Sequence, residues 1–229
     1  MKLFLGALFG VLAIPAFADL VPVTNFSFET LPASPTLHDS CGIGCLFTTT
    51  DDPGNLIPGW MATGIPFQGT GQFNPGVSSG TTSYYNSIPD GNWIAYLNGG
   101  NLTQTVGVVV AANTTYTLSV AEGLRKDFPN LGTTELLING TAYVATGSAP
   151  TLGNWSTFTA VYNSALHPAD VGSAITIELL SNTTQAGFDN VVLNKTANNT
   201  VPEPASIALL STVLGVLGLT VGRRRRVSI

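Results

Sequence analysis

Two cysteines are the residues whose spacing most directly suggests chemistry. Cys41 and Cys45 are the only cysteines of the 229-residue chain, and two of the three residues between them are glycine. A metal site needs more ligands, of which only His38 is near, and redox pairs usually have two intervening residues. In an exported protein a close pair favours a disulfide, and the glycines give a small ring its backbone freedom. We therefore predict a structural disulfide between Cys41 and Cys45.

The acidic residues and the histidines form no catalytic motif that the sequence reveals. Glycosidases need two opposed carboxylates, but none of the 12 acidic residues between Asp19 and Thr200 lies in a recognisable catalytic motif. His38 and His167 are isolated, and Asp51-Asp52 is either a metal-binding pair or part of a solvated loop. A nucleophile elbow, a zinc-type histidine pair and a phosphate-binding glycine loop are all missing. The sequence thus predicts that the protein is not an enzyme.

The elements that must position these residues lie between two terminal segments. Residues 1–18 carry Lys2 next to the initial methionine, continue in an apolar run and end in Ala16-Phe17-Ala18. This pattern is typical of a secretory signal that signal peptidase removes after Ala18. The alternative is an N-terminal membrane anchor.

The C-terminal segment, residues 201–229, combines three features. A Pro-Glu-Pro motif comes first, and residues 205–222 then form an uncharged apolar stretch. As a helix that stretch would span ~27 Å, about the thickness of a bilayer core. Four arginines follow and would stay on the cytoplasmic side of the membrane. The residues concerned are Pro202, Glu203, Pro204, Arg223, Arg224, Arg225 and Arg226.

Together these features resemble the PEP-CTERM sorting signal of Gram-negative bacteria. The resemblance implies an exosortase as partner, recognition of the Pro-Glu-Pro motif, and a precursor held in the inner membrane. It also implies delivery to the cell envelope, the cell surface or the extracellular matrix. The other interpretation is a plain single-span anchor with a proline-rich linker.

Composition limits what the middle of the chain can be. From Asp19 to Thr200 there are 12 acidic residues but only three basic ones, Arg125, Lys126 and Lys195. Such a surface cannot hold a phosphate backbone well, so nucleic acid is not expected as a partner. The 25 glycines and 14 prolines argue against a helical bundle.

Alternating apolar residues predict β-strands in this middle region. The alternation covers 116–121, 157–162 and 175–180, and Asn139-Gly140 has the composition of a hairpin turn. We therefore expect an all-β fold over residues 19–194, an antiparallel β-sandwich of the jelly-roll type, followed by a polar linker at 195–200. Residues 30–90 are rich in proline and glycine, which predicts long loops with few short strands, and loops of this kind often carry binding sites.

A series of short motifs resembles the galactose-binding-like jelly rolls, which include many carbohydrate-binding modules. The departure is Phe26, which stands where glycine is common. The motifs are Asn25–Glu29, Ile57–Trp60, Asp90–Leu97, Leu102–Thr105, Tyr116–Leu118 and Gly187–Val191.

The resemblance implies two kinds of site. In similar jelly rolls a glutamate of the first strand and an aspartate of the last, here Glu29 and Asp189, meet and help hold a structural calcium ion. The alternative is that Glu29 is exposed and Asp189 caps a turn. Sugar stacking would use Trp60, Tyr84 and Tyr85, although aromatic residues of small sandwiches are more often part of the core.

From these observations we expect an exported surface or matrix protein without catalytic activity. Its role would be structural or adhesive, in a biofilm or an envelope exopolysaccharide. Alternatives are a dedicated carbohydrate-binding module with a defined sugar, and a secreted hydrolase whose site has no familiar motif.

Overall fold

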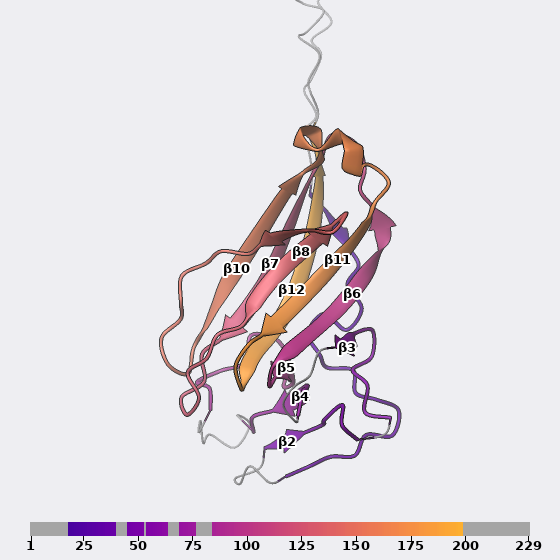
Figure 1. Ribbon diagram of the computed structural model, residues 1–229. Helices are drawn as coiled ribbons and strands as arrows, with labels where there is room; N and C mark the ends of the chain where they lie inside the picture. Colours follow the sequence, from indigo (N-terminus) through magenta and orange to yellow (C-terminus); the bar gives the residue numbers. More distant parts are fainter. Residues whose placement is uncertain (1–17, 40–44, 53, 64–68, 77–83, 199–229) are drawn as a thin grey trace, which may run out of the picture. The chain divides into compact units, whose positions relative to one another are not determined.

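The computed structural model describes residues 18–39, 45–52, 54–63, 69–76 and 84–198. Within them, the strands form two antiparallel sheets (Figure 1). The seven-stranded sheet has the order β10 (Trp155–Asn163), β7 (Thr114–Gly123), β12 (Ala186–Ala197), β5 (Ile94–Leu97), β4 (Gly71–Asn74), β2 (Leu46–Phe47), and β1 (Ala18–Val21) also pairs with β12. The five-stranded sheet has the order β3 (Met61–Thr63), β6 (Gly100–Val109), β11 (Ala174–Ser181), β8 (Thr133–Ile138), β9 (Thr141–Val144).

The predicted all-β antiparallel sandwich is confirmed. Two short 3-10 helices, η2 (Ser164–Leu166) and η3 (Pro168–Asp170), connect β10 to β11. No helix among the residues described has the length and apolar character needed to cross a bilayer. The predicted signal peptide up to residue 17 and the sorting segment 201–229 lie outside the described residues.

The main core fills the space between the two sheets. Along β7, Tyr116, Leu118 and Val120 are buried in it, whereas Thr115, Thr117 and Ser119 are only half-buried. Strand β11 repeats the pattern with Ile175 and Ile177, again as the sequence predicted. Period-2 burial of this kind follows from the opposite directions of successive side chains in a strand. The predicted hairpin at Asn139 and Gly140 joins β8 to β9, and both residues have the positive φ that such a turn requires.

Strand β12 contains a β-bulge that the sequence pattern did not predict. Ala186 and Phe188 face the main core before the bulge, and Val191 and Leu193 face it afterwards. The pairing register with β7 shifts between Asp189 and Val192, and residue 190 has φ 48°. The extra residue reverses the alternation, and it places Asp189 at a point where the ladder is interrupted.

Strand β5 is buried on both faces, because a second layer covers the side of its sheet away from the main core. Ala95 and Leu97 belong to the main core, whereas Ile94 and Tyr96 belong to a second cluster. We call this cluster the outer aromatic layer. Its members are Cys45, Phe47, Phe73, Tyr84, Tyr85, Ile88, Ile94, Tyr96 and Trp155.

Glycines let the outer aromatic layer approach the sheet closely. A Cβ atom on Gly187 would lie 2.3 Å from the hydroxyl of Tyr85, and one on Gly123 would lie 2.8 Å from the ring of Trp155. The rings of Tyr85 and Trp155 pack against each other at a tilt, with centroids 4.6 Å apart. Any larger side chain at these two strand positions would push the rings away from the sheet.

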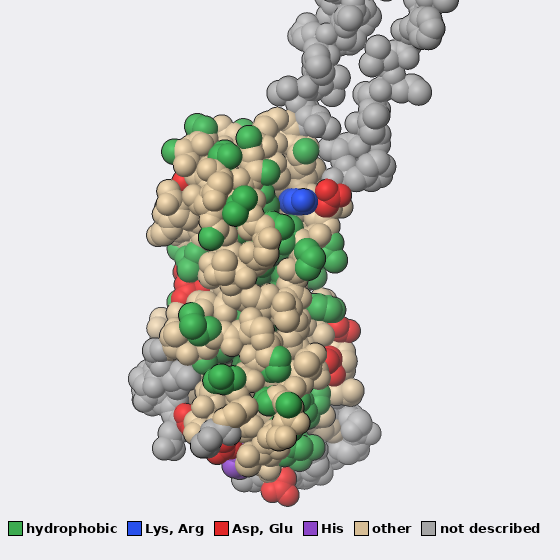
Figure 2. Space-filling model, turned by 90° about the vertical axis from the view of Figure 1, so that its right-hand side faces the viewer, with side chains coloured by type: hydrophobic (Ala, Val, Ile, Leu, Met, Phe, Trp, Pro, Cys, Tyr) green, Lys and Arg blue, Asp and Glu red, His purple; other side chains and the backbone are tan. Residues whose placement is uncertain are grey.

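Elsewhere the exposed apolar side chains are scattered. On the face shown in Figure 2, hydrophobic side chains lie among polar ones without forming one broad patch, and basic side chains are scarce. This agrees with the low charge of the chain, in which 9% of residues are charged. Scattered apolar residues are normal for a protein surface and need no partner.

Candidate active site

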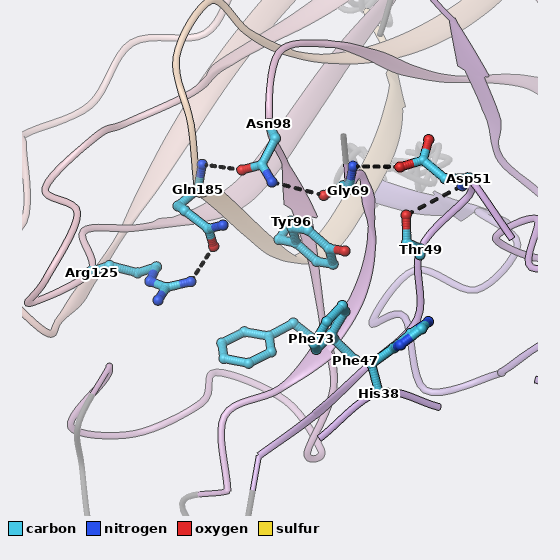
Figure 3. Close-up of a pocket in the computed structure, with 10 residues that line it drawn as sticks. All are labelled: His38, Phe47, Thr49, Asp51, Gly69, Phe73, Tyr96, Asn98, Arg125 and Gln185. Atoms are coloured by element: carbon cyan, nitrogen blue, oxygen red, sulfur yellow. Dashed lines mark hydrogen bonds between the residues drawn. The ribbon is translucent and has the colours of Figure 1, made fainter. Parts of the chain in front are cut away.

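The outer aromatic layer borders a cavity of about 440 Å³. Phe47, Phe73 and Tyr96 supply aromatic walls, and polar side chains from several loops complete the lining (Figure 3). The remaining lining residues are His38, Thr49, Asp51, Gly69, Asn98, Arg125 and Gln185. A concave site with apolar walls and a few polar groups is the usual form of a small-molecule site.

Strand pairing explains how the aromatic walls are held. Residue 38 forms an isolated antiparallel bridge with Phe47, with both N–H···O distances at 2.9 Å. Directly paired residues place their side chains on the same face, and the rings of His38 and Phe47 stack with centroids 5.0 Å apart. Phe47 in turn meets the ring of Tyr96 edge-on, at 6.2 Å.

The hydroxyl of Tyr96 fixes a loop above the sheet. It donates a 2.9 Å hydrogen bond to the carbonyl of Thr48. That loop lies so close to β4 that a Cβ atom on Gly71 would be 2.1 Å from the same carbonyl oxygen. Burial raises the pKa of Tyr96 well above its ordinary value, so this group stays a neutral donor.

His38, which lines the cavity, forms an imidazole–carboxylate pair with Asp52, which is not among the lining residues. The Nε2 atom of His38 lies 2.6 Å from Oδ2 of Asp52, and both side chains are partly exposed. The same carboxylate oxygen accepts a 3.3 Å hydrogen bond from Asn55, which also binds both backbone polar groups of Thr36. A carboxylate on one ring nitrogen fixes the orientation of an imidazole and leaves its other nitrogen free for proton transfer.

A chain of hydrogen bonds ties the loops around the cavity together (Figure 3). The N–H of Gly69 donates to Oδ2 of Asp51 at 3.0 Å, and its carbonyl accepts from Asn98 at 3.1 Å. The other amide atom of Asn98 accepts from the backbone N–H of Gln185 at 2.7 Å. The side-chain oxygen of Gln185 then accepts a hydrogen bond from Arg125. Asn98 is the central link, because it joins two loops that are distant in sequence.

The two predicted calcium ligands lie on either side of one turn. Oε1 of Glu29 accepts hydrogen bonds from the N–H groups of Asn92 at 2.8 Å and Trp93 at 2.6 Å. Oδ2 of Asp189 accepts from the N–H of Asp90 at 3.0 Å. Glu29 is exposed, whereas Asp189 is completely buried. Asp189 therefore caps the turn and Glu29 is exposed, as the alternative interpretation proposed, and Glu29 in addition accepts hydrogen bonds from the same turn.

Burial raises the pKa of Asp189 to about 8, because a charged carboxylate is poorly solvated there. The two backbone N–H donors lower this pKa by less than burial raises it, and the negative charges of Asp90 and Glu29 make smaller contributions that raise it. Among the described residues there is no group of three or more side chains of the metal-binding types. The geometry brings the predicted pair to one turn but assembles no larger ligand set from the described part of the chain.

Two of the three residues proposed to stack on a sugar are buried. Trp60 is 6% exposed and packs on Phe28 with ring centroids 5.4 Å apart, and Tyr85 is fully buried. Neither ring offers a free face to a sugar, so the prediction of stacking at these two positions is wrong. Tyr84 is half-buried, and its ring lies 4.5 Å from the guanidinium carbon of Arg125.

The cysteine prediction falls partly outside the described residues. Cys45 is buried and disulfide-bonded. Cys41, its predicted partner, lies outside the described part of the chain, so the pairing itself stays a prediction.

A second hollow lies over β3 and β6 on the five-stranded sheet. Its volume is about 430 Å³, and it is lined by backbone and side chains of residues 56–61 and 103–105. Leu56 and Met61 are exposed there. None of the described residues that line it carries a titratable side chain, so these residues supply no group for proton transfer.

The structure thus defines an all-β sandwich protein. It has an aromatic cavity on one face of a sheet, and the imidazole of an imidazole–carboxylate pair lies at the wall of that cavity. The sequence profile of the HpiC1-like family, described as HpiC1 cyclase, matches residues 19–194. The chain belongs to this family.

Two solved structures share the fold. One is a cyclase from Fischerella sp. TAU in complex with 4-(1H-indol-3-yl)butan-2-one, with 24% identity and a TM-score of 0.59. The other is the Stig cyclase Fisc from the same source, in complex with (3Z)-3-(1-methyl-2-pyrrolidinylidene)-3H-indole, with 24% identity and a TM-score of 0.58. Each match covers 80% of this chain and 100% of the other. Among curated proteins, none matches this chain.

Membership of a cyclase family corrects three predictions. The prediction that the protein is not an enzyme is wrong, and so is the structural or adhesive role in exopolysaccharide. The description of the domain as a biofilm or carbohydrate-binding protein is likewise overturned. The expected fold led to the wrong function, because one fold can serve unrelated functions and the function depends on the site. The PEP-CTERM and exosortase assignment gains no support from the family profile, which ends at residue 194.

The residues that line the cavity were missed for a physical reason. His38 and Asp52 are 14 positions apart and meet only after loops fold over β4 and β5. The available signal was the adjacent Asp51-Asp52 pair in a loop-rich segment that also contains His38. No single motif joins them, so the sequence left His38 isolated and Asp51-Asp52 as either a metal-binding pair or part of a solvated loop.

Proposed function

We propose that this protein is a cyclase that closes a ring on an aromatic, indole-type substrate by proton transfer in the outer cavity. The observation that carries the proposal is the His38–Asp52 pair at the wall of a cavity lined by Phe47, Phe73 and Tyr96. The family profile supports the reaction class, and the indole ligands of the two related structures support the substrate class.

The reaction needs no oxidant or reductant. A proton added to one carbon of an alkene side chain leaves a carbocation on the other carbon. The π electrons of the indole ring then form the new C–C bond, and the ring position attacked loses its own proton. Product and substrate have the same formula, so the protein needs only to supply and remove a proton.

Each part of the cavity has a function in this scheme. His38 exchanges the proton, since imidazole can both donate and accept near neutral pH, and Asp52 orients it. Aromatic ring faces attract cations, so Phe47 and Phe73 stabilise the positive charge of the intermediate.

The test is an assay of the purified full-length chain with 3-prenylindole. We expect a ring-closed product of unchanged mass, and in D₂O a product that has gained one deuterium on the former side chain. His38→Gln should lower kcat/KM by about 100-fold, because it removes the proton-exchanging group. His167→Gln is the matched control, since His167 stacks on Tyr162 and does not line the cavity. Equal rates for both variants would contradict the proposal.

We also propose a calcium ion at the turn between Glu29 and Asp189. The support is geometric: the buried carboxyl of Asp189 and the carboxylate of Glu29 bind backbone N–H groups of the same turn. Burial is the main cause of the raised pKa of Asp189, and the negative charges of Asp90 and Glu29 raise it further. A hard divalent cation with oxygen ligands would balance that charge and tie the first loop to the last strand. Calcium at millimolar concentration should raise the melting temperature of the wild type but not of Asp189→Asn. No rise in the wild type would leave the carboxylates as turn caps only.

Export remains a proposal from the sequence alone. The signal at residues 1–18 would direct secretion, with signal peptidase as the processing enzyme. The hydrophobic segment at 205–222 would hold the precursor in the membrane until sorting. N-terminal sequencing of the mature protein tests the first step: a chain that still begins at Met1 would contradict it.

A further inference from the structure

Arg125 lies at the end of the cavity away from Asp51 and is unusually confined for a basic residue (Figure 3). It is 7% exposed. Its guanidinium carbon lies 4.5 Å from the ring centroid of Tyr84, 5.3 Å from that of Phe73 and 5.7 Å from that of Phe128. Aromatic rings around a planar guanidinium hold it in one orientation and exclude water from it.

The hydrogen bonds of Arg125 leave part of its donor capacity unused. Nε and one terminal nitrogen donate to the two carboxylate oxygens of Asp127 at 3.0 and 2.8 Å. The other terminal nitrogen donates to Oε1 of Gln185. A guanidinium has five N–H groups, so two have no partner among the described residues. Asp127 already balances the positive charge.

Gln185 adds a further donor beside Arg125. Because a guanidinium can only donate, the amide oxygen of Gln185 must face it, and the amide nitrogen then points the other way, toward the cavity (Figure 3). That nitrogen donates to no residue in the described part of the chain. The backbone of residue 185 is held in place by its 2.7 Å hydrogen bond to Asn98, at φ 65°.

These donors make one end of the cavity a binding site for a hydrogen-bond acceptor. An anion is disfavoured, because Asp127 neutralises Arg125 and the carboxylate of Asp51 borders the same cavity. Resting on the proposed function, we infer that Arg125 and Gln185 bind the carbonyl oxygen of an uncharged aromatic substrate. A carbonyl oxygen has two lone pairs and can accept from both residues at once.

The test compares three indoles by calorimetry on the purified full-length chain. The probes are 4-(1H-indol-3-yl)butan-2-one, 3-butylindole, which lacks the oxygen, and the carboxylate 3-(1H-indol-3-yl)propanoate. The ketone should bind about tenfold more tightly than 3-butylindole, because a hydrogen bond from a charged donor contributes this much. The carboxylate should bind no more tightly than the ketone.

Gln185→Glu tests the donor directly. It keeps an oxygen for Arg125 but replaces the cavity-facing N–H₂ with an acceptor, so the preference for ketone over 3-butylindole should fall toward one. Asn182→Asp is the matched control, since it makes the same chemical change in the same exposed turn outside the cavity lining. The measured quantity is the ratio of one variant's affinities for two ligands. A general loss of folded protein lowers both affinities alike and therefore does not mimic the effect.

The outcomes separate this inference from the proposed function. Equal wild-type affinities for ketone and 3-butylindole would overturn the carbonyl site while leaving an indole-binding cavity. Tighter binding of the carboxylate would overturn the inference of an uncharged acceptor. Failure of all three indoles to bind would contradict the proposed function itself.

Discussion

The main core and the outer aromatic layer are built by different means. The main core consists mostly of aliphatic side chains from regular strands, paired residue by residue across β7, β12, β6 and β11. The outer aromatic layer takes its rings from short strands, loops and the start of β10, and hydrogen bonds between loops hold its cavity open. We therefore expect the main core to determine stability and the outer aromatic layer to determine what the protein binds.

The same sheet serves both regions. On β5, Ala95 and Leu97 pack inward and Ile94 and Tyr96 pack outward, so four consecutive buried residues separate the core from the cavity. A rigid strand with loops on one face holds binding groups more accurately than loops alone. Substitutions in the main core should therefore change mainly the stability, and substitutions in the outer aromatic layer mainly the binding and turnover. The expected effects below decrease from the first substitution to the last.

Leu118→Ala should produce the largest loss of stability. Leu118 is completely buried in the main core, and truncation of such a residue leaves a cavity that costs about 2–5 kcal/mol. Urea unfolding should show this loss, while kcat/KM per folded molecule stays near that of the wild type. A comparable loss of kcat/KM in the folded fraction would contradict the view that the main core and the cavity act independently.

Phe47→Ala should show the opposite pattern. The ring is half-buried and lines the cavity between His38 and Tyr96, so its removal should cost only about 1 kcal/mol of stability. Turnover of 3-prenylindole should fall at least tenfold, because a cavity wall is lost and His38 loses its stacking partner. An unchanged turnover would show that the cavity is not where the reaction occurs.

The Asp189 carboxyl gives a pH dependence whose sign is fixed by its pKa. In the calcium-free protein that pKa is raised from 3.8 to about 8. The folded protein thus holds a proton that the unfolded chain releases, and this stabilisation is complete below about pH 4 and lost as the pH rises through about 8. The melting temperature in a chelator should therefore fall over this interval, and Asp189→Asn should flatten the fall.

If the melting temperature of Asp189→Asn still falls with pH, the remaining dependence has an identified source. Glu122 faces the main core, accepts a hydrogen bond from Thr134 at 2.8 Å, and has a pKa that burial raises. Its contribution has the same sign as that of Asp189. Glu122→Gln in addition should flatten the profile further, and a melting temperature that rises with pH in the wild type would contradict both assignments.

The smallest predicted effect concerns the link between loops. Asn98→Ala removes the hydrogen bonds to Gly69 and Gln185, at a cost of about 1–2 kcal/mol. KM should rise several-fold with little change in kcat, because the cavity walls are held less firmly while the proton-transfer pair is intact. A fall in kcat alone would instead connect Asn98 to the chemical step.

The sequence predicted the main core well and the cavity poorly. Alternation in 116–120 and 175–179 is a local signal, and it led directly to the strands and to the face that each one buries. The bulge at Asp189 and Asn190 broke that alternation without any glycine or proline to mark it. The turn between β8 and β9 was predictable, because its two residues need a positive φ that Asn and Gly adopt readily.

The cavity depends on contacts between loops, for which the sequence has no periodic signal. His38 and Asp52 meet across 14 positions, and Asn98 and Gln185 meet across 87. Loop-rich composition in residues 30–90 predicted a binding site there, and six of the ten described residues that line the cavity come from that interval. The aromatic residues were assigned wrongly in part, because composition cannot distinguish a ring that covers a strand, such as Tyr85, from one that faces a ligand.

The most direct test is a crystal structure of the protein with 4-(1H-indol-3-yl)butan-2-one. We predict that the indole ring lies in the outer cavity against Phe47, Phe73 and Tyr96, with His38 within reach of the ring or its side chain. The hollow over β3 and β6 has nearly the same volume, about 430 Å³ against about 440 Å³, and serves as the internal comparison. An indole bound in that hollow, or between the sheets, with the outer cavity empty would contradict the account.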